Sequence, residues 1–259
     1  MVCPQLLQQY VRERVPGSQP TRVCPGSCST PHASHRSGAT SAHATAQTVA
    51  ATGDRKLDFA CPCARVLSPP VEYFTADLHL AHPKLARLRG FDTVASHDAA
   101  VMAQLYRLSP ETDELWVLGD ICSGGVASME SALAQLSTLH VPMHLVTGNH
   151  DPVSPMYRNA QKHFADYAVV FASVQQVART KVGGEGVMLS HFPYAGTPDR
   201  FSRKSFDQYQ LPDLGMWLIH GHTHSGERRS GKRSICVSLE AWDLRPASAE
   251  EITAEMQLR

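Results

Sequence analysis

The sequence predicts a layered α/β domain over residues 70–259 of a 259-residue chain. Short apolar runs rich in β-branched and aromatic residues alternate with segments of helical periodicity in the first half of this region, and strands dominate the second half. A third observation concerns position: Asp, Asn and His residues follow directly after the expected strands. Because open α/β folds bind ligands at the carboxyl ends of strands, the same observation predicts where the site lies.

The first half of the domain alternates strands with helices. Residues 71–76 (VEYFTA) have the β-branched and aromatic composition of a strand, and apolar residues recur at helical spacing over 97–108. Residues 114–118 (ELWVL) predict a second strand, 128–139 a second helix, and 142–147 (PMHLVT) a third strand. We expect these units to form one sheet with helices packed on it.

The second half is mostly strand. A loose helix is expected over 157–164. The strands expected after it cover 167–177, 186–190, 216–220 and 234–239. A closing helix begins near Ser248, whose side chain can cap it together with Glu251 three residues later.

Residues 1–69 differ from the rest of the chain. They are rich in Ser, Thr, Ala, Pro and Gly and have no sustained apolar period, which predicts a disordered low-complexity extension, with an organelle transit peptide as the alternative. Five of the seven cysteines lie before residue 70, so they form no disulfide framework for the domain. This distribution favours a reducing, cytoplasmic location.

Composition excludes two classes of protein. The 24 basic and 24 acidic residues cancel, so the chain lacks the positive surface of a protein that binds nucleic acid stably. No stretch approaches the roughly 18 consecutive apolar residues of a membrane span. We therefore expect neither a membrane nor a nucleic acid as a stable partner.

Five short polar motifs carry the chemistry. In chain order they are Asp77-Leu78-His79, Gly119-Asp120, Gly148-Asn149-His150-Asp151, Ser190-His191 and Gly221-His222-Thr223-His224. Each is weak alone, but all five follow an expected strand and can therefore converge on one point. Carboxylates, imidazoles and one amide are what a pair of hydrolytic metal ions needs.

The spacing within the motifs suits metal binding. Alternate residues of an extended segment point the same way, so Asp77 and His79 are expected to hold one ion, and His222 and His224 repeat this spacing. Asp120 follows a glycine that permits a tight backbone, and it is the natural bridge between two ions about 3.5–4 Å apart.

The motifs resemble those of the calcineurin-like metallophosphoesterase superfamily, over about residues 71–259. The flanking sequences YFTADLHLAHP, LSHFP and ICVSLEAWDLRP are similar to those of its small bacterial and phage members. The resemblance implies a four-layer α/β/β/α sandwich with two central mixed β-sheets. By matching positions, it also implies one ion held by Asp77, His79, Asp120 and His224, and a second held by Asp120, Asn149, His191 and His222. His150 would be the catalytic histidine near the leaving group, with Asp151 orienting it.

The function that follows is a metal-dependent phosphoesterase that attacks phosphorus with a metal-bridging hydroxide. Gly119-Asp120 is followed by Ile-Cys-Ser-Gly-Gly rather than the Val-Asp-Arg-Gly type of the protein phosphatases. We therefore expect a phosphodiester, nucleotide or other small phosphate ester as substrate. The alternatives are a nucleotide pyrophosphatase with the same site and a non-catalytic scaffold. We expect two divalent ions, manganese first, with Fe, Zn, Co or Ni as alternatives.

Four further residues are weaker candidates. His82 could face the cleft or cap a helix. Arg158 and Arg200 could bind a phosphate, and Tyr194 could stack on a nucleobase.

Overall fold

The computed structural model describes residues 70–197 and 204–258. Its first sheet has the strand order β10-β1-β2-β3-β4, in which β1 to β4 are parallel and β10 is antiparallel to β1. Its strands are β1 (Val71–Thr75), β2 (Asp113–Val117), β3 (Met143–Val146), β4 (Ser173–Gln175) and β10 (Ala247–Ser248).

The second sheet is also mixed. Its order is β5-β6-β7-β9-β8, with β6, β7 and β9 parallel and the two outer strands antiparallel to their neighbours. Its strands are β5 (Val177–Val182), β6 (Glu185–Ser190), β7 (Trp217–His220), β8 (Arg229–Gly231) and β9 (Ser234–Cys236).

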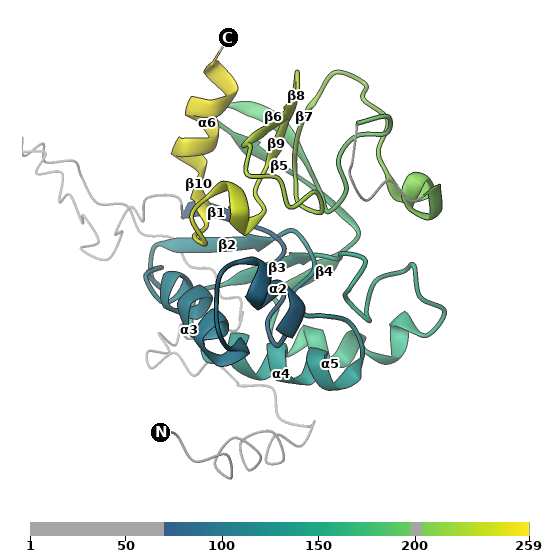
Figure 1. Ribbon diagram of the computed structural model, residues 1–259. Coiled ribbons are helices and arrows are strands. Elements are labelled where there is room, and N and C mark those ends of the chain that lie inside the picture. The colour runs from purple at the N-terminus through teal and green to yellow at the C-terminus, as the bar shows by residue number, and fades with distance from the viewer. Residues whose placement is uncertain (1–69, 198–203, 259) are drawn as a thin grey trace, which may run out of the picture. The chain divides into compact units, whose positions relative to one another are not determined.

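Helices flank the sheets. Figure 1 shows α3, α4 and α5 together beside the β1–β4 sheet, and α6 next to β10. The α-helices are α2 (Pro83–Leu88), α3 (Val94–Leu105), α4 (Val126–Leu136), α5 (Phe164–Ala168) and α6 (Ala249–Gln257), and the 3₁₀ helices are η1 (Ala160–Lys162), η2 (Lys204–Tyr209) and η3 (Leu239–Ala241). No helix within the described residues is long and apolar enough to span a membrane.

The side chains of β2 and of the residue after it alternate between two hydrophobic cores. Leu115 and Val117 are fully buried in the core that β1–β4 share with the helices. Trp116 and Leu118 point the other way, into the core between the two sheets. The predicted fold class, an α/β sandwich with two central mixed sheets, is thereby confirmed.

The capped helix α6 is where the sequence placed it. Ser248 Oγ accepts from the Glu251 backbone N–H, and the Glu251 carboxylate accepts from the Ser248 N–H, which is the predicted capping box. The prediction for 167–177 is wrong in part, because Tyr167 belongs to α5 and the strand residues in this range are Ser173–Gln175 of β4 and Val177, where β5 begins. Tyr167 is fully buried in the helical core, and this packing outweighs the strand propensity of its neighbours.

Several elements were missed or displaced, among them β5 beyond Val177, β8 and β10, which no predicted strand covers. Helix α2 follows His82 and is only six residues long, too short for a periodicity signal. The observed α3 and α4 begin and end two to three residues before the predicted ranges. The extension predicted for residues 1–69 lies outside the described residues.

Candidate metal centre

The five polar motifs meet because their strands run parallel. They follow β1, β2 and β3 in the first sheet and β6 and β7 in the second. Main-chain hydrogen bonds continue beyond the strands and hold the loops in register: Asp77 N–H donates to Gly119 O (3.0 Å), and His79 N–H donates to Asp120 O (2.9 Å). The predicted convergence at the carboxyl ends of strands is confirmed.

Two glycines permit this close approach. A Cβ at Gly119, whose φ is +89°, would lie 2.5 Å from His191 Nδ1. A Cβ at Gly148 would overlap the Asp120 carboxylate. Side chains at either position would therefore push the motif loops apart.

The motif residues adopt left-handed backbone conformations. The φ angles are +58° for Asp77, +46° for His79, +57° for Asp120, +68° for His222 and +47° for His224. The predicted extended segments are wrong: the alternate residues face the site because each lies at a left-handed turn. Such conformations cost on the order of 1 kcal/mol for a non-glycine residue, and they cluster at functional sites.

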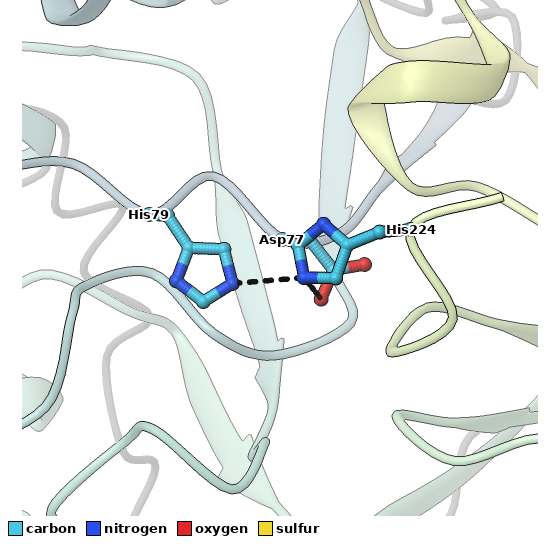
Figure 2. A group of neighbouring side chains, drawn as sticks. All are labelled: Asp77, His79 and His224. Atoms are coloured by element: carbon cyan, nitrogen blue, oxygen red, sulfur yellow. Dashed lines mark hydrogen bonds and ion pairs between the residues drawn. The ribbon is translucent and has the colours of Figure 1, made fainter. Parts of the chain in front are cut away.

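The first ligand group consists of Asp77, His79 and His224, whose ligand atoms all lie within 4.8 Å of one another. Figure 2 shows the two imidazoles facing each other beside the carboxylate. The Nε2 atoms of the two histidines are 3.3 Å apart, and His224 Nε2 is 3.9 Å from Asp77 Oδ1. His79 Nδ1 lies 3.0 Å from Cys122 O, and His224 Nδ1 lies 2.9 Å from Glu240 Oε1.

These partners determine the tautomers. A carbonyl or carboxylate oxygen only accepts, so Nδ1 of His79 and of His224 carries the hydrogen, and in the neutral rings both Nε2 atoms present lone pairs. Two lone pairs and a carboxylate at this separation repel one another unless a proton or a cation lies among them. A divalent cation fits this donor set.

The Asp77 carboxylate is fully buried. Its Oδ2 accepts from Ser238 Oγ (2.6 Å) and from His222 N–H (2.9 Å), whereas Oδ1 has no hydrogen-bond partner among the described residues. Burial by itself would raise the pKa of this carboxyl, but the positive charge that the nearby imidazoles carry when protonated, His224 first, holds it well below the ordinary value. Asp77 is therefore an anion at neutral pH with one oxygen directed at the candidate ion.

The second ligand group consists of Asp120, Asn149 and His191, and Asp77 also lies near it, because the ligand atoms of Asp77, Asp120 and His191 are all within 4.8 Å of one another. His191 Nε2 lies 3.5 Å from Asp120 Oδ2 and 3.1 Å from Asn149 Oδ1. His191 Nδ1 lies 2.8 Å from Leu118 O, to which it must donate, so its Nε2 also presents a lone pair. With the amide in this orientation, three acceptors face one another, and a cation again fits.

Asp120 lies between the two groups. Its Oδ2 is 3.6 Å from His79 Nε2 as well as 3.5 Å from His191 Nε2, and its Oδ1 accepts from His150 N–H (2.7 Å). Burial, followed by the Asp151 charge, raises the pKa of the Asp120 carboxyl well above the ordinary value, and a bound cation would offset both effects. This is the position that a bridging carboxylate requires.

His222 lies beside the second ligand group. Its ring centroid is 5.1 Å from that of His191 and 4.8 Å from that of Phe192. Burial lowers the pKa of His222 to about 3, so the ring is neutral at pH 7 and suited to bind a metal.

His150 and Asp151 are arranged differently from the prediction. His150 Nδ1 lies 3.2 Å from Ser123 O, and its ring centroid is 5.2 Å from that of His79. The Asp151 carboxylate instead accepts three backbone N–H groups, those of Asp120 (2.9 Å), Ile121 (3.0 Å) and Gly148 (2.8 Å). The prediction that Asp151 orients His150 is wrong: Ser123 O orients the histidine, and Asp151 ties two motif loops together.

The three weaker candidates within the described residues lie in different surroundings. His82 Nδ1 accepts from Leu85 N–H as the N-cap of α2, and its ring lies edge-on to that of His79 at 5.3 Å, so it both caps the helix and faces the site. Tyr194 is buried and donates to Met216 O (3.0 Å), which makes it a packing residue rather than a stacking surface. Arg158 is exposed, and Arg200 lies outside the described residues.

Sequence reasoning missed the residues that support the ligands. Glu240 accepts from His224, Ser238 donates to Asp77, and the Tyr157 hydroxyl donates to the Asn149 carbonyl. The available signal was composition, because a serine and a glutamate interrupt the apolar run ICVSLEAW. Neither position, however, carries a ligand spacing.

Comparisons with known proteins identify the family of the chain. Residues 74–239 match the calcineurin-like phosphoesterase superfamily domain. The chain is 39% identical over 191 residues to the Gene 66 protein of Mycobacterium phage L5, covering 70% of this chain and 91% of that protein. It is also 39% identical over 183 residues to the Gene 66 protein of Mycobacterium phage D29, covering 67% and 90% respectively. The fold is similar to that of protein AQ665 from Aquifex aeolicus, with a TM-score of 0.54 and 23% identity, covering 72% of this chain and 99% of that one.

The chain therefore belongs to the calcineurin-like phosphoesterase superfamily, and it is a hydrolase of phosphate esters. Its Asp and His groups are able to bind metal. The alternative of a non-catalytic scaffold is set aside.

Proposed function

We propose that this protein is a dinuclear metal-dependent phosphoesterase that prefers phosphodiesters or nucleotide-like small substrates. The observation that carries the proposal is the convergence of hydrogen-bond acceptors: His79, His191 and His224 each commit Nδ1 to an oxygen and turn Nε2 toward buried carboxylates. We propose Mn²⁺ as the ion at both groups, with Fe, Zn, Co or Ni as substitutes. Two such ions would neutralise charge on the phosphoryl oxygens and supply an activated water as nucleophile.

His150 is proposed as the general acid. Its Nδ1–H donates to Ser123 O, which leaves Nε2 as the atom that can give a proton to the leaving oxygen. Asp151 contributes by holding the Asp120 and Gly148 loops.

A diester preference is supported by the use of Arg89. This buried guanidinium lies beside the first ligand group, but it is bound to Glu240 and to the carbonyls of Asp77 and Leu78. It is therefore unavailable to the second negative charge of a phosphomonoester, which a free arginine would hold. We also propose a reducing cytoplasm as the location, in keeping with the free, buried Cys122 and Cys236.

The test is hydrolysis of bis(p-nitrophenyl) phosphate and p-nitrophenyl phosphate by the metal-stripped full chain, before and after Mn²⁺ is added. Asp120→Asn is assayed beside it. We expect Mn²⁺ to restore diester cleavage in the wild type and not in the variant. Faster monoester cleavage would overturn the substrate preference, and full activity without metal would overturn the metal dependence.

A further inference from the structure

Arg89 is a buried arginine whose side chain is only 4% exposed, and the proposed reaction leaves it without a role. It follows helix α2 as its C-cap and donates in two directions. Its Nε and Nη2 donate to Glu240 Oε1 (3.0 and 2.9 Å). Its Nη2 and Nη1 donate to the carbonyls of Asp77 (2.7 Å) and Leu78 (3.2 Å).

The Arg89 guanidinium has a further contact, with His97. Its Nη1 lies 2.9 Å from His97 Nε2, and because arginine only donates, His97 Nε2 must be the acceptor. His97 therefore carries its hydrogen on Nδ1 and donates to Asp98 Oδ1 (2.8 Å). The other Asp98 oxygen accepts from Ala81 N–H (2.9 Å) and from Gln135 Nε2 (3.1 Å), which anchors this chain of bonds to α3 and α4.

Glu240 transmits the position of Arg89 to a ligand. The same Oε1 that accepts from Arg89 also accepts from His224 Nδ1 at 2.9 Å. The carboxylate keeps the His224 hydrogen on Nδ1 and turns Nε2 toward Asp77 and His79. Such partners of ligating histidines commonly change metal affinity by about 10–100-fold.

The bonds to main-chain carbonyls act on the other two ligands of the first group. Asp77 and His79 both have positive φ, a conformation that must be held by its surroundings. Arg89 binds the carbonyls of Asp77 and of the intervening Leu78, so it fixes the turn that presents both side chains. In the second ligand group His191 is oriented by Leu118 O and not by Arg89. Asp77, which Arg89 does contact, lies near both groups.

From these contacts we propose that Arg89 is a positioning residue for the ion held by Asp77, His79 and His224. It acts through Glu240 and through the main-chain carbonyls of Asp77 and Leu78. It leaves binding of the ion beside Asn149 and His191 nearly unaffected. The inference rests on the proposed metal centre. It deepens that proposal by giving His224 and His191, the histidine ligands of the two ions, separate supports.

The experiment is a titration of the metal-stripped full chain with Mn²⁺, in which bound ions per chain are counted by equilibrium dialysis and the affinity of each ion by calorimetry. The variants are Glu240→Gln, which keeps the side-chain shape, and Arg89→Lys, which keeps the charge but loses the planar fork. Arg228→Lys is the matched control, because Arg228 pairs with Glu255 (3.0 Å) and has no contact with the ligands among the described residues. Circular dichroism checks that each variant is folded.

We expect two ions in the wild type and in Arg228→Lys. In Glu240→Gln and Arg89→Lys, one ion should bind about 10–100-fold more weakly and the other within about threefold of wild type. Asn149→Ala shows which affinity belongs to which ion. Alone it should weaken binding of the ion in the second ligand group, and combined with Glu240→Gln it should weaken binding of both ions. Wild-type affinities for both ions in the two variants, or equal weakening of both, would overturn the inference but leave the proposed function intact. A wild type that binds no divalent ion would overturn both.

Discussion

The Nε2 atoms of His79 and His224 lie 3.3 Å apart although, in the neutral form of each ring, this atom presents a lone pair. Hydrogen bonds on the far side of each ring enforce the arrangement, so it is built into the fold rather than induced by a ligand. Asp77 Oδ1 has no hydrogen-bond partner among the described residues. The two features together describe a place where a cation is stabilising and its removal is costly.

Metal removal should therefore destabilise the protein. Adding Mn²⁺ at about 100 times its Kd to the metal-stripped chain should stabilise the fold by about 2.7 kcal/mol, which raises Tm by about 5–10 °C for a domain of this size. Differential scanning calorimetry measures the shift. Asp120→Asn is the comparison and should show a much smaller rise; an equal rise would mean that the ion binds elsewhere.

His150→Ala should separate chemistry from metal binding. The variant should keep both ions and lose a factor on the order of 10²–10⁴ in kcat on a diester with a poor leaving group, because such a leaving group needs a proton. Steady-state kinetics with a matched exposed substitution, His140→Ala, provide the check. Undiminished activity of His150→Ala on that diester would disprove the acid role.

The main effect of Asp151→Asn should be a loss of stability rather than a loss of catalysis. The carboxylate accepts three backbone N–H groups in a fully buried position, and the amide would present an N–H to donors that have no other partner. We expect the free energy of unfolding to fall by about 2–4 kcal/mol. Urea unfolding measures it, with Asp166→Asn as the control, since that side chain is 55% exposed. If Asp151→Asn unfolds like wild type and only kcat falls, Asp151 is catalytic after all.

The alternation of strands and helices, and the α6 capping box at Ser248, could be read from the sequence because each depends on neighbouring residues. The ligand candidates could be found because five short motifs each follow a strand. The contact between Arg89 and Glu240 joins positions 151 residues apart, and no local pattern reports it. The left-handed turns at Asp77 and His79 were equally hidden, since Asp-x-His is compatible with an extended strand.

The stability of the metal-free protein should depend on His220 in a definite pH window. His220 is fully buried between Gly221 O (2.7 Å) and Ser230 Oγ (2.5 Å), and burial lowers its pKa from 6.5 to about 4. The unfolded chain therefore binds a proton below pH 6.5 that the folded chain does not bind until about pH 4. The titration of His220 therefore lowers the free energy of unfolding of the protein as the pH falls through this window, by roughly 1.4 kcal/mol per pH unit.

His220→Gln isolates this contribution, because glutamine does not titrate. Between pH 7 and pH 5 the wild type should lose more unfolding free energy than the variant, so the difference between them narrows as the pH falls. Urea unfolding of both metal-free proteins at each pH gives the result. Parallel pH profiles would show that His220 is not neutral in the fold.

The most direct test of the account is anomalous diffraction from crystals of the full chain grown with Mn²⁺. We predict two manganese peaks, one among Asp77, His79 and His224 and one beside Asn149 and His191, with the Asp120 carboxylate in contact with both. A single peak, or peaks away from these side chains, would contradict the claim that the convergent acceptors form a dinuclear metal centre.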